Sequence, residues 1–197
     1  MGTEIFDEPA AWELARDGDA EAFAQFFDAH HGRVFGQALR LIRNAHDAEE
    51  VTAVVFLEAW RRRAAVRIVN GSIIGWLLVT TNNVSHNLRR SRHRYRAAID
   101  RLSHSVAEEG PFAELDERLD RVGRDATVRS IFSQLTRNDQ NVMTLCVIEE
   151  LSLADAAAAL GVPLGTVKSR LSRAKQRLAR LTAEAFDENT TTSGGVK

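Results

Sequence analysis

Apolar side chains recur at helical spacing through most of the chain. Between Ala20 and about Arg43 they follow one another three or four residues apart, and Gly32 is a candidate kink. The members of this stripe are Phe23, Phe26, Phe27, Val34, Ala38, Leu41 and Ile42. The alternation of apolar and polar residues that is typical of strands never persists. The pattern therefore predicts an all-α protein.

Two further helices are predicted in the first half, on either side of a turn. The run DAEEVTAVVFLEAWRRR opens with acids at the positive end of a helix, where Glu50 can close a capping box with Asp47. The turn VNGS covers residues 69–72. A long helix is then predicted from about Ile73 to about Arg96, and its last turns are rich in arginine.

A change of composition divides the chain. Residues from about 97 to 125 are acid-rich and contain Gly110-Pro111, which is typical of a linker. We predict two small helical domains joined by a flexible acidic linker. The expected parts are an N-terminal segment at 1–19, a first domain at 20–96, the linker at 97–126, a second domain at 127–182 and a disordered tail at 183–197.

The second domain carries the signals of capped helices. Thr136 and Asp139 are spaced as a capping box, and Ser152 is placed as the N-cap of the next helix. That helix must end at Gly161 in a left-handed turn, and Pro163 opens the last helix. Two helices joined by a tight glycine turn form the helix-turn-helix pattern.

The last helix has an apolar face and a basic face. Its core-facing stripe is Leu164, Val167, Leu171, Ala174, Leu178 and Leu181. The opposite face holds Lys168, Ser169, Ser172, Arg173 and Gln176, flanked by Arg170, Lys175 and Arg177. Cations attract phosphates, and Arg, Ser and Gln can reach base edges in a major groove. A merely solvated face is the alternative for a basic helix taken alone, and the glycine turn before it favours DNA binding.

Composition narrows the remaining classes of function. The 197 residues carry a formal net charge of −1, so DNA binding must depend on how charge is distributed. The single cysteine, Cys146, excludes an intramolecular disulfide and a cysteine-based zinc site. His30 and His31 are adjacent and point to different faces, and the common nucleotide-binding and hydrolase motifs are absent. We expect no cofactor, no metal and no enzymatic activity. The acidic N-terminus and the lack of a long apolar run indicate a cytoplasmic protein.

Two blocks of sequence resemble one known family. DAEEV…VFLEAW followed by GSIIGWLLVTTNNVSHNLRR resembles region 2, and LTRNDQNVMTLCVIEELSLADAAAALGVPLGTVKSRLSRAKQRL resembles region 4, of extracytoplasmic-function (ECF) bacterial sigma factors. The resemblance covers about Asp19 to Leu181. It implies a dissociable RNA polymerase subunit that recognises a −35 promoter element with region 4, and recognises and melts a −10 element with region 2.

The resemblance also implies a role for each candidate site. The −35 set is Lys168, Ser169, Arg170, Ser172, Arg173 and Gln176. The −10 set is Asn70, Gly71, Ser72, Asn82, Asn83, Arg89 and Arg90, in which Asn83 matches the Asn near the flipped base and the arginines are expected to contact phosphates. Trp76 could stack on a base, but a Trp at this spacing is more often part of the core.

The helix after Asp47 is apolar on more sides than one core needs, which indicates a partner. The resemblance names that partner as the clamp helices of the largest polymerase subunit. The set expected to bind core polymerase is Asp47, Glu50, Val51, Val54, Phe56, Leu57 and Trp60. Burial of these side chains within region 2 is the alternative. Family members usually have a Gln-acid pair where this chain has Ala53-Val54, which leaves core affinity open.

A second class of function is a free-standing helix-turn-helix regulator with an N-terminal effector domain. The Asn82-Asn83 pair and the arginine-rich helix end beside an over-apolar helix favour the sigma factor, because a regulator needs none of them. We also expect the two domains to close on each other in the free protein, or around an anti-sigma factor.

Overall fold

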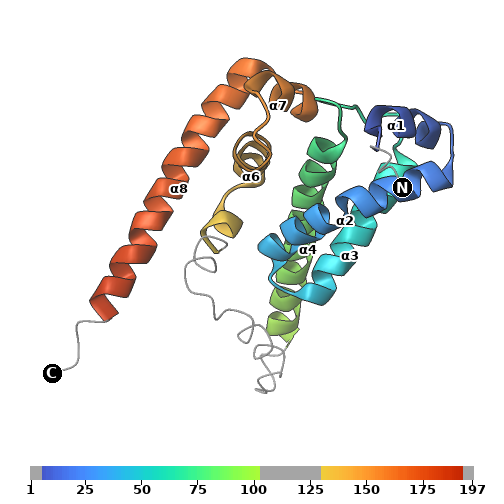
Figure 1. Cartoon of the computed structure of the whole chain (residues 1–197). Helices are drawn as coiled ribbons and strands as arrows, with labels where there is room; N and C mark the ends of the chain where they lie inside the picture. The colour runs from blue at the N-terminus through green and yellow to red at the C-terminus, as the bar shows by residue number, and fades with distance from the viewer. Residues whose placement is uncertain (1–5, 103–129, 193–197) are drawn as a thin grey trace.

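The computed structural model describes residues 6–102 and 130–192, and within these ranges every regular element is a helix (Figure 1). The predicted all-α fold is confirmed. An isolated bridge pairs Val69 with Ser72. None of the described helices is long and apolar enough to cross a membrane.

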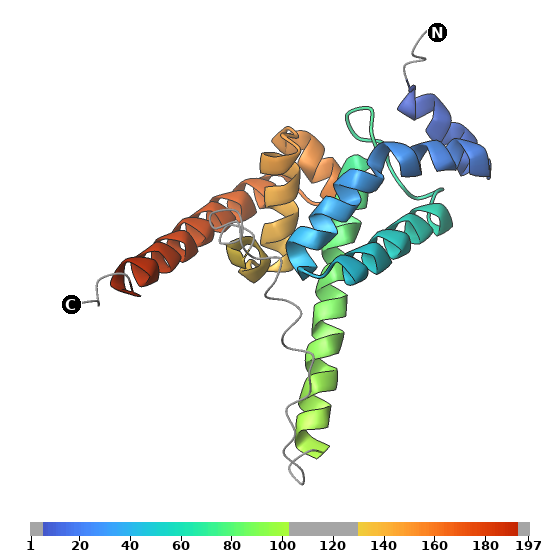
Figure 2. The same cartoon turned by 60° about the horizontal axis from the view of Figure 1, so that its bottom comes forward.

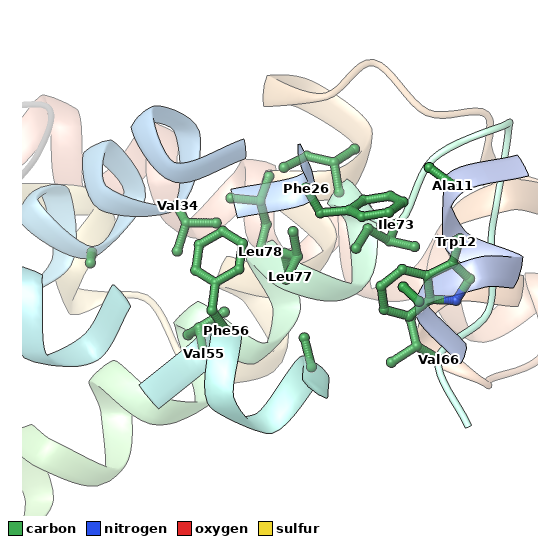
Figure 3. Packing of buried hydrophobic residues seen from close by; sticks show 14 of the residues in the cluster. Ala11, Trp12, Phe26, Val34, Val55, Phe56, Val66, Ile73, Leu77 and Leu78 are labelled. Carbon is green, nitrogen blue, oxygen red and sulfur yellow. The ribbon is translucent and has the colours of Figure 1, made fainter. Parts of the chain in front are cut away.

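Helices α1 to α4 form an N-terminal unit. Their bounds are α1 Glu8–Arg16, α2 Ala20–Ile42, α3 Ala45–Arg61 and α4 Ile74–Leu102. Trp12, Phe26, Ile73 and Leu77 lie at the centre of its core and are almost completely buried (Figure 3). Burial of each such side chain contributes about 1.5–3 kcal/mol, so this core holds the four helices in fixed positions.

A C-terminal unit follows after residue 129. It contains α6 (Arg137–Met143), the π-helical segment η1 (Thr144–Ile148), α7 (Leu153–Leu160) and α8 (Leu164–Thr192). Leu145, Ala156 and Val167 pack together and are buried. The free part of α8 and the end of α4 project away from the body of the molecule (Figure 2).

The helix caps predicted for the C-terminal unit are confirmed. The Thr136 hydroxyl accepts a hydrogen bond from the Asp139 N–H at 3.3 Å, and Ser152 accepts one from the Asp155 N–H at 3.1 Å. Gly161 is left-handed, with φ of 63°. Each cap satisfies backbone groups that a helix end leaves without partners.

The capping box expected between Asp47 and Glu50 is wrong. The N-cap of α3 is Asn44, whose side chain accepts from the Asp47 N–H at 3.0 Å. Asp47 is buried and pairs with Arg92 of α4, and Glu50 faces His46 on the surface. The helix begins one turn earlier than expected, so Asn44 caps its first N–H groups and the Asp47 side chain pairs across the bundle instead.

Several predicted boundaries also change. Helix α2 runs through Gly32 without interruption, and α8 continues to Thr192 where a tail was expected from residue 183. No Gly or Pro follows until Gly194, and Ala and Glu are strong helix formers. Leu164 is 42% exposed and leaves the core-facing stripe, because it is the first residue of its helix.

Two other boundaries concern the linker and the N-terminal segment. Residues 97–102 belong to α4, and the remainder of the linker expected at 97–126 lies outside the described residues. Helix α1 lies in the segment 1–19, for which no helix was predicted.

The two units pack against each other along α4. Gln37 of α2 donates to Asn82 of α4 at 2.7 Å, and Asn82 donates to Asn141 at 2.8 Å and to Thr144 at 3.2 Å. All four side chains are buried. At Gly75 an added Cβ would lie 3.5 Å from Leu145, which is an ordinary contact, so α4 lies close enough to the C-terminal unit that a longer side chain at this position would meet it.

Candidate nucleic-acid interface

Helix α8 is held by the apolar stripe predicted for it. Val167 and Ala174 are fully buried, and Leu171 and Leu178 are partly buried in the cluster that contains Met143. The stripe fixes the rotation of α8 about its own axis. Its polar side is therefore turned outward.

The turn before α8 sets the direction of the helix. The Gly161 N–H donates to the Ala158 carbonyl at 3.3 Å, and the Val162 N–H donates to the Ala157 carbonyl at 3.1 Å. This pair of bonds is a Schellman motif, which needs a left-handed residue such as Gly161. The two helices and this turn form the predicted helix-turn-helix.

The outward side of α8 carries the −35 set. Lys168, Ser169, Ser172, Arg173 and Gln176 are exposed, and Arg170 is half-buried. Five of the six predicted residues thus share one exposed helix face, and Arg170 lies at its flank.

A hollow with positive lining lies beside this face. Arg170, Arg173 and Gln176 line it together with Asn138 of α6. At its edge Arg177 pairs with Asp139 at 3.1 Å, which anchors α8 to α6. Guanidinium and amide groups around a hollow suit the oxygens of a phosphate backbone.

The predicted −10 turn is a two-residue hairpin. The Val69 N–H donates to the Ser72 carbonyl at 3.0 Å, and the Ser72 N–H donates back at 3.2 Å. Asn70 and Gly71 between them have φ of 53° and 74°, as a type I′ turn requires. Both are exposed, so the turn presents an amide side chain and bare backbone to solvent.

The polar run on α4 is divided between surface and interior. Asn83 is half-buried, and Asn82 is fully buried between the two units. Thr81 is buried and donates to the Leu77 carbonyl of its own helix at 2.8 Å. Of the two asparagines, only Asn83 is partly open to solvent, and Asn82 can meet DNA only if the units separate.

The arginine-rich end of α4 lies at the surface beside the C-terminal unit. Arg89 and Arg90 are exposed, and Arg89 donates to the Ser133 carbonyl at 2.8 Å. Both line a groove that also includes Leu41 and Leu135. The structure therefore places these two cations away from the hairpin turn, further along α4.

Trp76 is half-buried and packs against the core of the N-terminal unit. It also lines a hollow with Ala65, Ala158 and Leu160, at the junction of the two units. This placement is consistent with the core interpretation of Trp76.

The candidate polymerase-binding residues on α3 fall into two groups. Val51 and Phe56 are buried, as is Asp47 in its ion pair with Arg92. Val54 and Leu57 are 42% and 54% exposed. Glu50 is exposed, and Trp60 is half-buried against Phe23. An exposed apolar pair on α3 thus remains after the core is filled, as expected of a surface that meets a partner.

Sequence reasoning did not single out Glu8, Gln37, Asn141 or Thr144. Glu8 contacts the hairpin turn, and the other three join the two units. Asp7 followed by Pro9 was a usable signal for a helix start before Glu8. No local pattern indicates which amides meet across two distant segments.

Within the described residues no group of three or more His, Cys, Asp or Glu side chains is placed to hold a metal ion. Burial raises the pKa of the Cys146 thiol, against the opposing charge of Lys175. A thiol with a raised pKa is mostly protonated near neutral pH and is therefore a poor nucleophile.

Comparison with known proteins agrees with this geometry. The family model described as "Sigma-70 region 2" matches residues 26–95, and "Sigma-70, region 4" matches residues 126–178. The ECF RNA polymerase sigma factor SigE of Mycolicibacterium smegmatis is 32% identical over 191 residues, which cover 95% of this chain and 70% of the relative. SigK of Mycolicibacterium vanbaalenii is 32% identical over 161 residues, or 78% of each chain.

Solved structures share the fold. The sigma factor RpoE of Bartonella quintana, in complex with the anti-sigma factor NepR, has a TM-score of 0.57 at 23% identity and covers 83% of this chain and 98% of its own. CnrH, in complex with the cytosolic domain of CnrY, also has a TM-score of 0.57 at 23% identity, with coverage of 90% and 97%. Two sigma regions in the same order, each matched by its own family model, and relatives aligned over most of their length show that this chain belongs to the ECF RNA polymerase sigma factors.

Proposed function

We propose that this protein binds RNA polymerase core enzyme, directs it to specific promoters and assists melting of the promoter DNA. The observation that carries the proposal is the presence, on one chain, of a helix-turn-helix with an exposed basic face and a separate helical bundle with an exposed apolar pair on α3. A free-standing regulator needs the helix-turn-helix but not the bundle with its exposed apolar pair. The family match does not favour that alternative.

We assign −35 recognition to α8 within a region 4 at 127–182. The exposed residues Lys168, Ser169 and Arg173 lie in the first turns of α8, which is the part of a recognition helix that contacts bases. Gln176 and Arg170 lie beside the hollow and are assigned to the phosphate backbone or to neighbouring bases.

We assign −10 recognition and melting to region 2 at 20–96. The exposed hairpin residues Asn70 and Gly71 and the nearby Ser72 are candidates for contact with an unstacked base, as is Asn83 further along α4. Exposed amide and hydroxyl groups can form hydrogen bonds to base edges. Arg89 and Arg90 are assigned to phosphates.

We assign core binding to the exposed side of α3. Val54 and Leu57 provide apolar area, and Glu50 provides charge at the edge of the same surface. The buried members of the predicted set, Val51 and Phe56, support this surface from beneath. The partner proposed for it is the pair of clamp helices of the largest polymerase subunit.

The packed arrangement is proposed as the free or inhibited form. Elements about 25 base pairs apart are separated by about 85 Å, at about 3.4 Å per base pair. Units that share buried hydrogen bonds cannot span that distance, so they must separate when both elements are bound. RpoE was solved with an anti-sigma factor, and we propose that this chain also has an anti-sigma partner. We further propose that it acts in the cytoplasm, without catalytic chemistry of its own.

Run-off transcription with core polymerase tests the proposal. The wild-type protein is expected to direct core enzyme to a defined start, and Arg173→Ala is expected to lower transcription from the same promoter by about 5- to 150-fold, which corresponds to a base or phosphate contact of roughly 1–3 kcal/mol. Binding of Arg173→Ala to core enzyme should be unchanged. A protein that binds duplex DNA equally well with and without core, and never starts transcription, would contradict the sigma function.

A further inference from the structure

The hairpin turn at Val69–Ser72 is tied to helix α1 by one carboxylate, that of the half-buried Glu8. Oε1 of Glu8 accepts a hydrogen bond from the Ser72 hydroxyl at 2.8 Å and from the Ile73 N–H at 2.7 Å. It also lies 3.0 Å from Nε2 of His30 on α2. Segments from three places in the sequence therefore meet at a single oxygen atom.

This cluster is shielded from solvent. The side chains of Glu8 and His30 are only 14% and 7% exposed. Burial alone would raise the pKa of Glu8, but hydrogen bonds from His30, Ile73 and Ser72, together with the nearby His30 ring, outweigh it, and the pKa lies below its ordinary value. Glu8 is thus held as a carboxylate, which is the stronger acceptor for these donors.

The turn needs such support because its own bonds are few. Two backbone hydrogen bonds close the hairpin, and both residues at its tip adopt left-handed conformations that are uncommon outside glycine. Ser72, the last residue of the turn, is held by two hydrogen bonds of its hydroxyl. The hydroxyl donates to Glu8, and it accepts from the N–H of Ile74, the first residue of α4, at 3.1 Å. Ile73 is fully buried in the core next to these bonds (Figure 3).

We propose that Glu8 is a positioning residue for −10 recognition, which holds the Asn70–Ser72 turn in the orientation that a promoter base meets. This inference rests on the proposed function of that turn. Selectivity between bases depends on donors and acceptors held in fixed places, because a turn that moves can adapt to the wrong base. Helix α1 thereby becomes part of the promoter-recognition apparatus without touching DNA itself.

The test measures base preference separately from overall activity. Templates randomised across the −10 element, or across the −35 element, are transcribed with core polymerase, and the transcripts are counted by sequencing. Glu8→Ala is expected to lower preference at the −10 positions contacted by the turn by about tenfold, within the range of one base-specific contact. Preference at the −35 element and affinity for core enzyme should not change.

Matched variants separate positioning from folding. Glu8→Gln keeps a side-chain oxygen that can accept from Ser72 and Ile73, so it should restore most of the −10 preference. Glu8→Asp keeps the charge in the first turn of α1 but is one methylene too short to reach, so it should behave like Glu8→Ala. Glu13→Gln is the control on the same helix, where the exposed Glu13 pairs with Arg16 one turn away.

The outcomes distinguish this inference from the function on which it rests. If Asn70→Ala lowers −10 preference and both Glu8→Ala and Glu8→Asp leave it intact, the positioning role is wrong and the function of the turn stands. If Asn70→Ala itself leaves −10 preference intact, the turn does not recognise the element. Equal losses at −10, at −35 and in core binding in the Glu8 variants would reduce Glu8 to a structural residue and overturn the proposal.

Discussion

The interior of the N-terminal unit and its interface with the C-terminal unit are held together by different interactions. Inside the unit, Trp12, Phe26 and Leu77 supply large apolar side chains, and the buried Thr52 hydroxyl donates to the Ala48 carbonyl of its own helix at 2.7 Å. At the interface, buried amide and hydroxyl groups form hydrogen bonds across the two units, and Arg33 of α2 pairs with Glu149 beside them.

This difference indicates which contacts can be replaced by contacts with water when the units separate. Apolar surface exposed to water has no replacement partner, whereas a separated amide can form hydrogen bonds with water. The net contribution of a hydrogen bond is therefore only about 1 kcal/mol. Leu41 and Val79 add apolar contacts to this interface. The interface is suited to opening while each unit stays folded.

The largest effect is expected in the interior of the N-terminal unit. Phe26→Ala removes a fully buried ring and should lower the free energy of unfolding by about 3–5 kcal/mol, with loss of core binding and transcription together. Phe27, the next residue, is 40% exposed and provides the matched control. Chemical denaturation measures both. Equal destabilisation by the two alanine variants would contradict the assigned core.

A larger side chain at Gly75 is expected to act on the interface. An added Cβ would contact Leu145, Leu151 and Ala159, all of which belong to the C-terminal unit. Gly75→Leu should therefore destabilise the packed form by about 1–3 kcal/mol and separate the units, as seen in an increased radius of gyration by small-angle scattering. Gly75→Ala, whose Cβ fits at 3.5 Å, should stay closed. If Gly75→Leu stays equally compact and equally stable, the close approach at this position is incorrect.

Neighbouring residues on α6 allow a finer comparison. Asn141→Leu removes the acceptor for Asn82 and should weaken the interface by about 1–2 kcal/mol. Gln140 donates to the Phe132 carbonyl at 3.1 Å within the same unit, so Gln140→Leu should lower the stability of the C-terminal unit without opening the interface. Limited proteolysis and thermal unfolding separate the two effects. The comparison fails if both variants open the molecule to the same degree.

The smallest expected effect is on the pH dependence of stability, and it arises from Glu8 within the N-terminal unit. Because the pKa of Glu8 is lowered on folding, its carboxylate stabilises the fold above the unfolded-state pKa, and this contribution is lost as the pH falls through the lowered folded value. The wild-type protein should thus lose more stability between pH 6 and pH 3 than Glu8→Gln does. Denaturant titrations across this range measure the difference, and identical pH profiles would show that Glu8 contributes no such stabilisation.

Much of the fold followed from local pattern, and the interface did not. The caps at Thr136 and Ser152 and the left-handed Gly161 depend on residues close in sequence, so they could be predicted. The partner of Asp47 is Arg92, which lies on another helix, and the expected capping box was therefore wrong. The basic face of α8 follows from periodicity alone.

The candidate −10 residues also show that local sequence pattern does not predict contacts between distant segments. The sequence indicates that Asn82 and Asn83 are polar residues on one helix, but burial of Asn82 depends on Gln37, Asn141 and Thr144 meeting it in space. Thr144 begins the π-helical segment, which no sequence pattern indicated. Adjacent amides thus differ in environment for reasons that appear only once the units are packed.

We propose that the two units are packed in the free protein and separate on the promoter. Ala65 and Ala158 line the same hollow from opposite units, so fluorescent labels on Ala65→Cys and Ala158→Cys, in a Cys146→Ser background, report on the distance between them. Energy transfer should be high in the free protein and nearly absent with core polymerase on promoter DNA, where the two elements lie about 85 Å apart. High energy transfer in a complex that is transcribing from a −35-dependent promoter would show that the units stay packed together on the DNA.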